Sequence, residues 1–402
     1  MLKFFSPFFM TLCHICKGIR KLCGRERCPI LTRIYYQKLA IPKINESLFG
    51  PSPKSVFVGH ENYPDVFVGP MVSLNESNLE RVDTPEKMFG LSQEKIIRDR
   101  YSLVRGKLQK NVFTRDRYIR ELQAVTLSAK PVDMEINFRK KPSFSLSFSP
   151  ILQPMGASGE VNKIKVVDNP KIRSPVYKLI DDDIKADEVV VEFYKLNFNV
   201  SQISKILSSG VLGIKKKLVP TKWSITAIDA LLSKYFITKI KNFSSIDEYL
   251  LFENSYLGNH FYILLLPGNW EFEQFETWFP GTLWNLNSNS PEITVEFEFY
   301  FGRKDYASLQ SGGYYASRFA VSEGLYKMKK QARAIVIREV GKEYDIPVGV
   351  WEVRENVRAA LRKKPEKFGS LKQLLQNLKT KIKPEEYVKK SNLLRQKRIT
   401  DF

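Results

Sequence analysis

The sequence predicts a mixed α+β fold, and three observations support this prediction. The chain has 402 residues, of which 43% are hydrophobic and 12% aromatic, enough for a large globular core and more than one domain. Apolar residues alternate with a strand period in some segments and recur with a helical period in others. All four cysteines lie in one short N-terminal stretch, which predicts a small separate knuckle. The expected parts are a zinc-knuckle segment (1–45), a first α+β part of the body (46–150), a second α+β part with a helical C-terminal region (151–385) and a short mobile tail (386–402).

The cysteine cluster predicts a metal site. Cys13, Cys16, Cys23 and Cys28 lie in CHICKGIRKLCGRERC, where the first pair has the Cys-x-x-Cys spacing that lets two thiolates reach one ion. Four thiolates satisfy a tetrahedral zinc ion, so zinc is the expected cofactor, and the basic residues around them offset its thiolate charge. An iron–sulfur cluster takes the same ligands and is the alternative. Two disulfides would require an oxidising compartment, which nothing else in the sequence indicates.

The chain is strongly basic, with 64 Lys and Arg against 43 Asp and Glu and a formal net charge of +21. Such a charge is most often used to attract a polyanion. Nucleic acid is therefore the expected partner, and an acidic membrane surface is the second choice. No apolar run approaches the ~20 residues of a membrane span. The apolar start MLKFFSPFFMTL is broken by Pro7 and lacks a small-residue cleavage site, so we expect a mature, cytoplasmic protein.

The body begins with a predicted hairpin. The tetrapeptide Val-Phe-Val-Gly occurs at Val56–Gly59 and again at Val66–Gly69, with a polar loop between the two copies. Two β-rich runs around a polar loop are typical of a hairpin. Its tip is either an ordinary solvated loop or a binding loop, with His60 and Tyr63 as candidate nucleotide-binding residues.

Two further features complete the first part. SQEKIIRDRYSLVRGKL places Ile96, Ile97, Tyr101, Val104 and Leu108 at helical spacing, which predicts one helix through this segment. A stretch rich in Pro, Ser and Gly at about 139–160 predicts a connector and a soft domain boundary.

The second part mixes both kinds of element. ADEVVVEFYKL predicts a strand or a short buried helix, VSQISKILSSG a helix ended by Gly210, and SITAIDALLSKYFITKI a helix. HFYILLL and ARAIVIREV predict strands, and ITVEFEFYFG alternates strictly between apolar and mainly polar positions through Phe301. The C-terminal third predicts helices at about 353–363, 370–381 and 384–397.

A candidate phosphate site lies in SLQSGGYYASRF. Gly312 and Gly313 precede a helical stretch, and a Gly-rich turn at a helix N-terminus exposes backbone N–H groups to an anion. Arg318 lies about one turn further on and could reach the same phosphate, while Tyr314 could stack on a base. The alternative is that the glycines only permit a turn and the tyrosines belong to the core.

The sequence contains no motif with a recognised catalytic mechanism. There is no Walker A loop, dinucleotide fingerprint, His-Glu-x-x-His motif or Gly-x-Ser-x-Gly elbow. Whether the protein is an enzyme therefore stays open, and its catalytic residues are unknown.

Together these segments resemble the Nre family of archaeal DNA-repair proteins over nearly the whole chain. The resemblance is carried by the four-cysteine knuckle and by PSPKSVFVGHENYPDVFVGP, GIKKKLVPTKWSITAID, GNHFYILLLPGNWEFE, SGGYYASRF and DIPVGVWEVRENVRAAL. The sequence departs from the family pattern at His60–Asn62, where a basic or aromatic residue and a glycine are expected. The resemblance implies a DNA-repair role exercised by docking on the replication sliding clamp, PCNA. The expected partners are the clamp, DNA and other repair enzymes, in the cytoplasm at the nucleoid.

The last seven residues, QKRITDF, fit this implication. Gln396, Ile399 and Phe402 match the clamp-interacting pattern Gln-x-x-aliphatic-x-x-aromatic. A short helical turn would place the aliphatic and aromatic side chains on one side, as a plug for an apolar pocket. This copy has one aromatic residue, so we expect weak binding, strengthened by the several pockets of a ring-shaped clamp.

Two other functions stay open at this point. One is a nucleotide- or DNA-processing enzyme with its phosphate site near Gly312, Gly313 and Arg318. The other is a non-catalytic scaffold that joins the clamp to repair enzymes.

Overall fold

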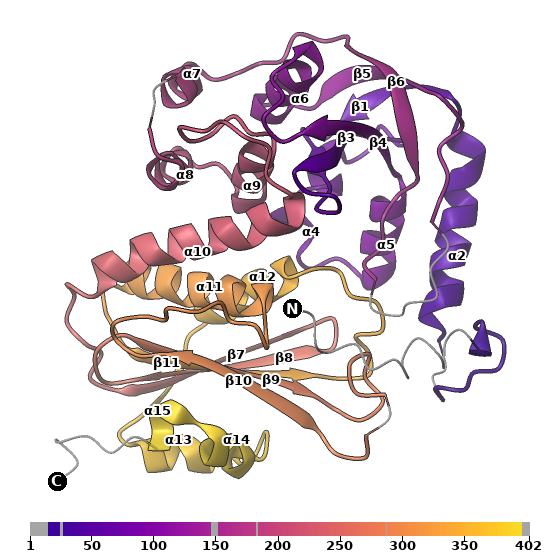
Figure 1. The fold of residues 1–402 in the computed structure, drawn as a ribbon. Helices are drawn as coiled ribbons and strands as arrows, with labels where there is room; N and C mark the ends of the chain where they lie inside the picture. The colour runs from indigo at the N-terminus through magenta and orange to yellow at the C-terminus, as the bar shows by residue number, and fades with distance from the viewer. Residues whose placement is uncertain (1–14, 25–26, 146–151, 182–183, 287, 396–402) are drawn as a thin grey trace. The chain divides into compact units, whose positions relative to one another are not determined.

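The computed structural model describes residues 15–24, 27–145, 152–181, 184–286 and 288–395. The chain forms two compact units, Met1–Leu231 with Ile346–Val348 and Leu232–Asp345 with Gly349–Phe402. We call them unit 1 and unit 2, and each is described by itself. Both combine helices with a sheet, which confirms the predicted α+β class (Figure 1). Within the described residues, no helix has the length and apolar character of a membrane span.

Unit 1 is built on a six-stranded sheet with the order β1-β5-β6-β4-β3-β2. Its strands are β1 (Ser47–Ser52), β2 (Val56–Val58), β3 (Asp65–Ser73), β4 (Leu103–Asn111), β5 (Val132–Phe138) and β6 (Ser158–Val166). The predicted hairpin is confirmed, because β2 and β3 pair antiparallel with Phe57 opposite Gly69. The stretch at 139–160, predicted as a soft boundary, connects β5 to β6, which pair within this sheet.

The strand alternation gives this sheet two different faces. The valines of β2 and β3 are buried in a core that also contains side chains of α6 (Arg117–Leu127). The alternate positions lie on the opposite side, which we call the outer face. By register it carries Phe57 of β2, Phe67 of β3, Arg105 and Lys107 of β4 and Ser158 of β6.

The other helical elements of unit 1 are α2 (Pro29–Ala40), the 3-10 turn η1 (Ile41–Lys43), α3 (Leu79–Val82), α4 (Pro85–Met88), α5 (Gln93–Tyr101), α7 (Ser174–Asp181), α8 (Ala186–Lys195) and α9 (Val200–Ser208). ADEVVVEFYKL forms the helix α8 and not a strand. The end of α9 before Gly210 is confirmed, and the φ of +76° at Gly210 explains why glycine stands there. The predicted helix α10 (Thr221–Ile240) is confirmed as well, and the division between the units falls within it.

The single helix predicted through Leu108 is wrong. α5 begins after Ser92, whose side chain caps it, and ends at Tyr101, and β4 begins at Leu103. Val104 and Leu108 are four residues apart, a spacing that fits one face of a helix and also one face of a strand. Pairing with β3 makes this segment a strand.

Unit 2 contains a second six-stranded sheet with the order β10-β9-β11-β8-β7-β12. Its strands are β7 (Tyr249–Tyr256), β8 (Asn259–Leu266), β9 (Glu271–Trp278), β10 (Glu292–Glu298), β11 (Arg333–Val340) and β12 (Glu366–Phe368). HFYILLL and ARAIVIREV form β8 and β11, as predicted. β11 pairs antiparallel with β8 and parallel with β9.

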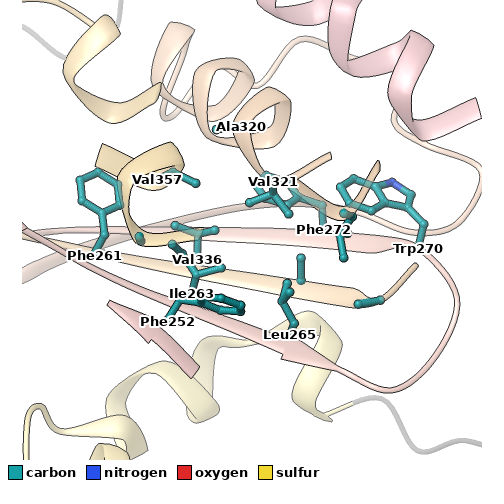
Figure 2. Packing of buried hydrophobic residues seen from close by; sticks show 14 of the residues in the cluster. Phe252, Phe261, Ile263, Leu265, Trp270, Phe272, Ala320, Val321, Val336 and Val357 are labelled. Atoms are coloured by element: carbon teal, nitrogen blue, oxygen red, sulfur yellow. The ribbon is translucent and has the colours of Figure 1, made fainter. Parts of the chain in front are cut away.

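Helices cover both faces of the unit 2 sheet. The helices α11 (Gly312–Met328) and α12 (Trp351–Leu361) pack on one face, over a core that includes Phe261, Phe272 and Val336 (Figure 2). The other face is covered by α13 (Leu371–Leu378), α14 (Pro384–Lys390) and α15 (Asn392–Arg395). The predicted C-terminal helices are therefore confirmed, with the last one divided into α14 and α15.

The predicted alternation of β10 is confirmed, but the strand ends at Glu298 and does not continue to Phe301. Glu296 and Glu298 are buried, whereas Phe301 is 95% exposed. The carboxylates can be buried because each has an arginine partner: Arg303 lies 2.8 Å from Glu296 and Arg318 lies 2.9 Å from Glu298.

Candidate functional site

Two exposed aromatic rings meet on the surface of unit 1. Tyr63 stands in the loop between β2 and β3, and Trp223 lies in the first turn of α10. Their ring centroids are 5.2 Å apart, and the two residues are 40% and 45% exposed. Lys217 donates a hydrogen bond of 3.2 Å from Nζ to the Tyr63 hydroxyl. The rings therefore form a supported aromatic surface, which we call the Tyr63–Trp223 platform.

Backbone contacts hold both sides of the platform. The loop is closed by a hydrogen bond of 2.8 Å from the N–H of Gly59 to the carbonyl of Phe67. The N–H of Val58 donates to Oγ1 of Thr221, two residues before Trp223, at 2.9 Å. The hairpin and the start of α10 are thereby joined, so the two rings are brought together by ordered elements.

Basic residues lie close to Trp223 in the chain, and Lys217, one of them, contacts the ring of Tyr63. Arg115 donates to the carbonyl of Lys215 at 3.2 Å, which brings the loop after β4 next to the lysine run. No ion pair links the cations of this group to any residue that the structure describes; they are Arg115, Lys215, Lys216, Lys217 and Lys222. Their charge is consequently available to a partner from solution. The loop itself also contributes two exposed acids, Glu61 and Asp65, and Asp65 accepts a hydrogen bond from Asn111.

This combination is suited to unpaired nucleic acid. Exposed aromatic rings stack on bases whatever their identity, and lysines beside them neutralise the backbone phosphates. His60, predicted with Tyr63, is exposed in the same loop. The sequence indicated this loop, whereas GIKKKLVPTKW was noted only for its family resemblance, and nothing in the sequence predicted that Trp223 stacks against Tyr63.

The candidate phosphate site at the start of α11 has different surroundings. Gly312 and Gly313 begin the helix, but both are buried, and Tyr314 is fully buried in the core. Arg318 is engaged with Glu298 and with the hydroxyl of Ser233 at 2.6 Å. Binding of an anion at this helix end stays a prediction. Arg318 is already paired with an internal carboxylate, that of Glu298.

The fit at Gly313 explains one of these glycines. A Cβ atom there would lie 2.8 Å from Oε1 of Glu276, so only glycine leaves room for this carboxylate. Tyr314, whose pKa is raised strongly by burial, packs at 5.2 Å against Phe272. These contacts favour the structural alternative for the glycines and for Tyr314.

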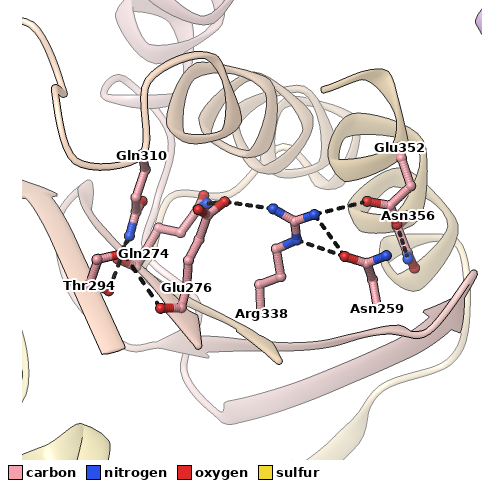
Figure 3. Close-up of polar contacts among 8 residues, drawn as sticks. All are labelled: Asn259, Gln274, Glu276, Thr294, Gln310, Arg338, Glu352 and Asn356. Atoms are coloured by element: carbon pink, nitrogen blue, oxygen red, sulfur yellow. Dashed lines mark hydrogen bonds and ion pairs between the residues drawn. The ribbon is translucent and has the colours of Figure 1, made fainter. Parts of the chain in front are cut away.

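Glu276 belongs to a buried ionic network that the sequence did not indicate (Figure 3). The guanidinium of Arg338 on β11 lies 2.8 Å from Glu276 and 3.4 Å from Glu352 of α12, and it donates two hydrogen bonds to Asn259. Asn356 donates to Glu352 at 2.9 Å. Burial raises the pKa of Glu352 to about 7. The charge of Arg338 acts in the opposite direction, and the charge of Glu276, which shares Arg338 with Glu352, raises the pKa further. The network joins β8, β9, β11 and α12 within unit 2.

Three of the four cysteines are described, and Cys13 lies outside the described residues. Cys16, Cys23 and Cys28 are free thiols. The backbone N–H of Leu22 and further N–H groups of the same turn hold the pKa of Cys16 below its ordinary value, against the opposing effect of burial. Within the described part of the chain no group of three possible metal ligands is found, so Cys16, Cys23 and Cys28 do not form one here.

Two glycines shape the turn that follows Cys16. Gly18 and Gly24 both have positive φ, at +81° and +65°. A Cβ atom at Gly18 would lie 3.4 Å from the sulfur of Cys28, so the two cysteine-bearing segments lie close together. N–H groups directed at a sulfur favour the thiolate, the form that binds metals. The predicted tail residues Gln396, Ile399 and Phe402 lie outside the described residues.

Comparison with known proteins covers nearly all of the chain. The family model described as "Archaeal Nre, N-terminal" matches residues 22–285, and "Archaeal Nre, C-terminal" matches residues 298–402. The chain is 38% identical to DNA repair protein NreA of Archaeoglobus fulgidus, over 93% of this chain and 95% of the relative. It is 36% identical to NreB of the same organism, over 97% and 99%, and 35% identical to NreA of Haloferax volcanii, over 78% of each. No solved structure matches the chain.

Both halves of the chain match the family models, and the relatives are covered over most of their length. The predicted resemblance to the Nre family is thereby confirmed. The chain belongs to the archaeal Nre family.

Proposed function

We propose that this protein is a DNA-repair protein that binds unpaired nucleic acid on the Tyr63–Trp223 platform. The observation that carries the proposal is the pair of exposed, touching rings among cations without acidic partners in the described residues. DNA is the expected nucleic acid because the relatives in Archaeoglobus and Haloferax are named DNA repair proteins. The formal net charge of +21 supports the same class of partner.

Binding of a fluorescent single-stranded oligonucleotide, followed by anisotropy, tests this proposal. Replacing Tyr63 and Trp223 together by alanine removes two stacking surfaces worth ~1–3 kcal/mol each. Affinity should therefore fall by about fivefold to about a hundredfold per ring. Tyr177→Ala is the matched control, since Tyr177 is similarly exposed at 47% in the same unit. Equal binding by the double variant and the wild type would contradict the proposal.

The proposal includes a structural zinc ion at Cys13, Cys16, Cys23 and Cys28, with an iron–sulfur cluster as the rival. The N–H groups around Cys16 support a bound thiolate, and bound zinc would supply folding energy to the knuckle. Elemental analysis of anaerobically purified protein should give about one zinc per chain and no iron. Iron with absorbance near ~400 nm would favour the rival, and Cys28→Ser should lower the metal content.

The proposal also includes docking on the sliding clamp through Gln396, Ile399 and Phe402. It is supported by the sequence pattern and by family membership. Zinc would hold the N-terminal knuckle, the platform would hold the nucleic acid, and the clamp would keep the protein at replicating DNA. The test of the tail is given below.

A further inference from the structure

Arg105 on the outer face of the unit 1 sheet is a buried cation without an acidic partner. It is 8% exposed and makes no ion pair with any residue of the described ranges. Its guanidinium lies 4.8 Å from the ring of Phe57, 3.4 Å from the carbonyl of Gly156 and 3.5 Å from the sulfur of Met155. Its Nε has no hydrogen-bond partner, and burial lowers the pKa of the guanidinium. A buried charge without a counterion is costly, so its presence calls for a ligand.

A second cation lies beside it. Lys107 is two residues further along β4, on the same face and opposite Glu160 in the β4–β6 register, and it makes no ion pair among the described side chains. Burial and then the charge of Arg105 lower the pKa of Lys107, while Glu61 raises it. Among the described residues that line the hollow, the carboxylate is Glu160, which is paired with Arg139 at 2.8 Å.

Lys107 lines an open hollow of about 480 Å³, within the range of small-molecule sites of roughly 300–1,000 Å³. The hollow is lined by Phe67, Lys107, Ser143, Ser145, Ser158, Gly159 and Glu160. Arg105 is not a lining residue, but its partner in the β4–β6 register, Ser158, is one. The site thus offers Lys107, serine hydroxyls, the ring of Phe67, which is 37% exposed, and the carboxylate of Glu160, with Arg105 on the neighbouring position of the same sheet face.

We propose that this hollow, lined by Lys107 and next to Arg105 on the same face of β4, binds the dianionic phosphate of a phosphomonoester, on a free nucleotide or at the end of a nucleic-acid strand. The charge of the two cations favours a phosphomonoester over a phosphodiester. A phosphodiester inside a strand carries one negative charge, whereas a phosphomonoester carries about −1.5 to −2 at neutral pH and matches two cations. Guanidinium and hydroxyl donors suit phosphate oxygens, and the exposed Phe67 ring can stack on the attached base.

Binding of a strand end in the hollow rests on the proposed function. The hollow lies near enough to the Tyr63–Trp223 platform for a strand bound there to reach it. Tyr63 and Phe67 are four residues apart, so their Cα atoms are separated by at most about 14 Å. A strand stacked on the platform would therefore have its terminal phosphate within a few nucleotides of the hollow.

Three oligonucleotides of one sequence test the inference by anisotropy: one with hydroxyl ends, one with a 5′-phosphate and one with a 3′-phosphate. We expect one phosphorylated strand to bind the wild type about tenfold or more tightly than the hydroxyl strand. Arg105→Met and Lys107→Met should each abolish this difference while leaving hydroxyl-strand affinity within about twofold. Lys163→Met removes an exposed lysine of β6 and should preserve the difference. Melts check that each variant folds.

Competition identifies the source of the phosphate. If free deoxyadenosine 5′-monophosphate binds the wild type but neither Arg105→Met nor Lys107→Met, and strand ends have no effect, the ligand is a nucleotide. If the hydroxyl strand binds while neither strand ends nor the mononucleotide are recognised, this inference fails and the proposed function stands. If the mononucleotide binds through Arg105 and no strand binds, the proposed function fails and this inference stands. Phosphate recognition that survives both methionine variants would also overturn the inference.

Discussion

Buried arginines have different partners in the two sheets of this protein. On β11 of unit 2, Arg333 lies 2.7 Å from Glu271, and Arg338 lies between Glu276 and Glu352. On β4 of unit 1, Arg105 is equally buried, yet the described residues provide it with no carboxylate. The unit 2 sheet is covered by helices on both faces, whereas the outer face of the unit 1 sheet borders an open hollow.

The difference separates two uses of the same side chain. A buried arginine that is matched by acids holds elements of the fold together, and its removal leaves buried carboxylates uncompensated. A buried arginine without an acid is costly to the fold, and an anion from outside would offset that cost. Unit 2 therefore has the features of a structural core, and unit 1 those of a binding unit.

The largest expected effect is on the matched arginine. Arg338→Met should lower the free energy of unfolding by ~3–5 kcal/mol, because Glu276 and Glu352 lose their common partner. Denaturant titration of the variant and the wild type measures this change. A loss below about 1 kcal/mol would mean that the network of Figure 3 does not stabilise unit 2.

The second prediction concerns the proton on the same network. The pKa of Glu352 is raised from 4.5 to about 7, so between these values the folded protein holds a proton that the unfolded chain has released. Stability should therefore fall as the pH rises from about 4.5 to about 7, by up to ~3 kcal/mol. Glu352→Gln is neutral at every pH, and its melts over this range should show a flatter profile. A profile as steep as that of the wild type would assign the titration to another group.

The third prediction concerns the tail. We expect Phe402 to bind the clamp and to contribute nothing to the stability of unit 2. Burying the ring of Phe402 in a clamp pocket is worth roughly 2–3 kcal/mol, so Phe402→Ala should weaken clamp binding about 30-fold or more. Ile399→Ala should cost less, and Gln396→Ala less still, because its hydrogen bond replaces one to water. Calorimetric titration of the clamp into each variant measures these losses.

Melting of the same variants is the control for the tail. The melting temperature should not change when residues 396–402 are removed. A lower melting temperature would indicate that Phe402 packs on the body, and unchanged clamp binding would indicate a chance match to the pattern.

Much of the fold could be predicted from local periodicity. The Val-Phe-Val-Gly hairpin and α10 have clear strand and helix patterns, and the short apolar runs of β8 and β11 are typical of buried strands. The segment through Leu108 was ambiguous, since a spacing of four residues fits both periods and only pairing with β3 decides. In β10 the alternation was clear, but the burial of Glu296 and Glu298 depends on arginines that are distant in sequence or belong to the following loop.

The candidate site was less predictable because it depends on contacts across long sequence separations. Tyr63 could be selected from its loop, but its contact with Trp223 spans 160 positions of the chain. Arg105 was hidden in a segment predicted as a helix, where a charged residue suggests a solvated face. Only the packed neighbouring strands show that Arg105 has no carboxylate partner among the described residues.

The most direct test of the contrast between the two arginines is a set of melts with and without deoxyadenosine 5′-monophosphate for the wild type, Arg105→Met and Arg338→Met. We predict that the free energy of unfolding of Arg105→Met lies within ~1 kcal/mol of the wild-type value. Methionine occupies most of the space of the arginine side chain and removes a buried charge without an acidic partner in the described residues. At a hundred times its Kd, the nucleotide should stabilise the wild type by about 2.7 kcal/mol and leave Arg105→Met unchanged. Arg338→Met should be destabilised without ligand. If Arg105→Met instead loses as much stability as Arg338→Met and still gains the full stabilisation from nucleotide, the distinction between a structural and a ligand-binding arginine is contradicted.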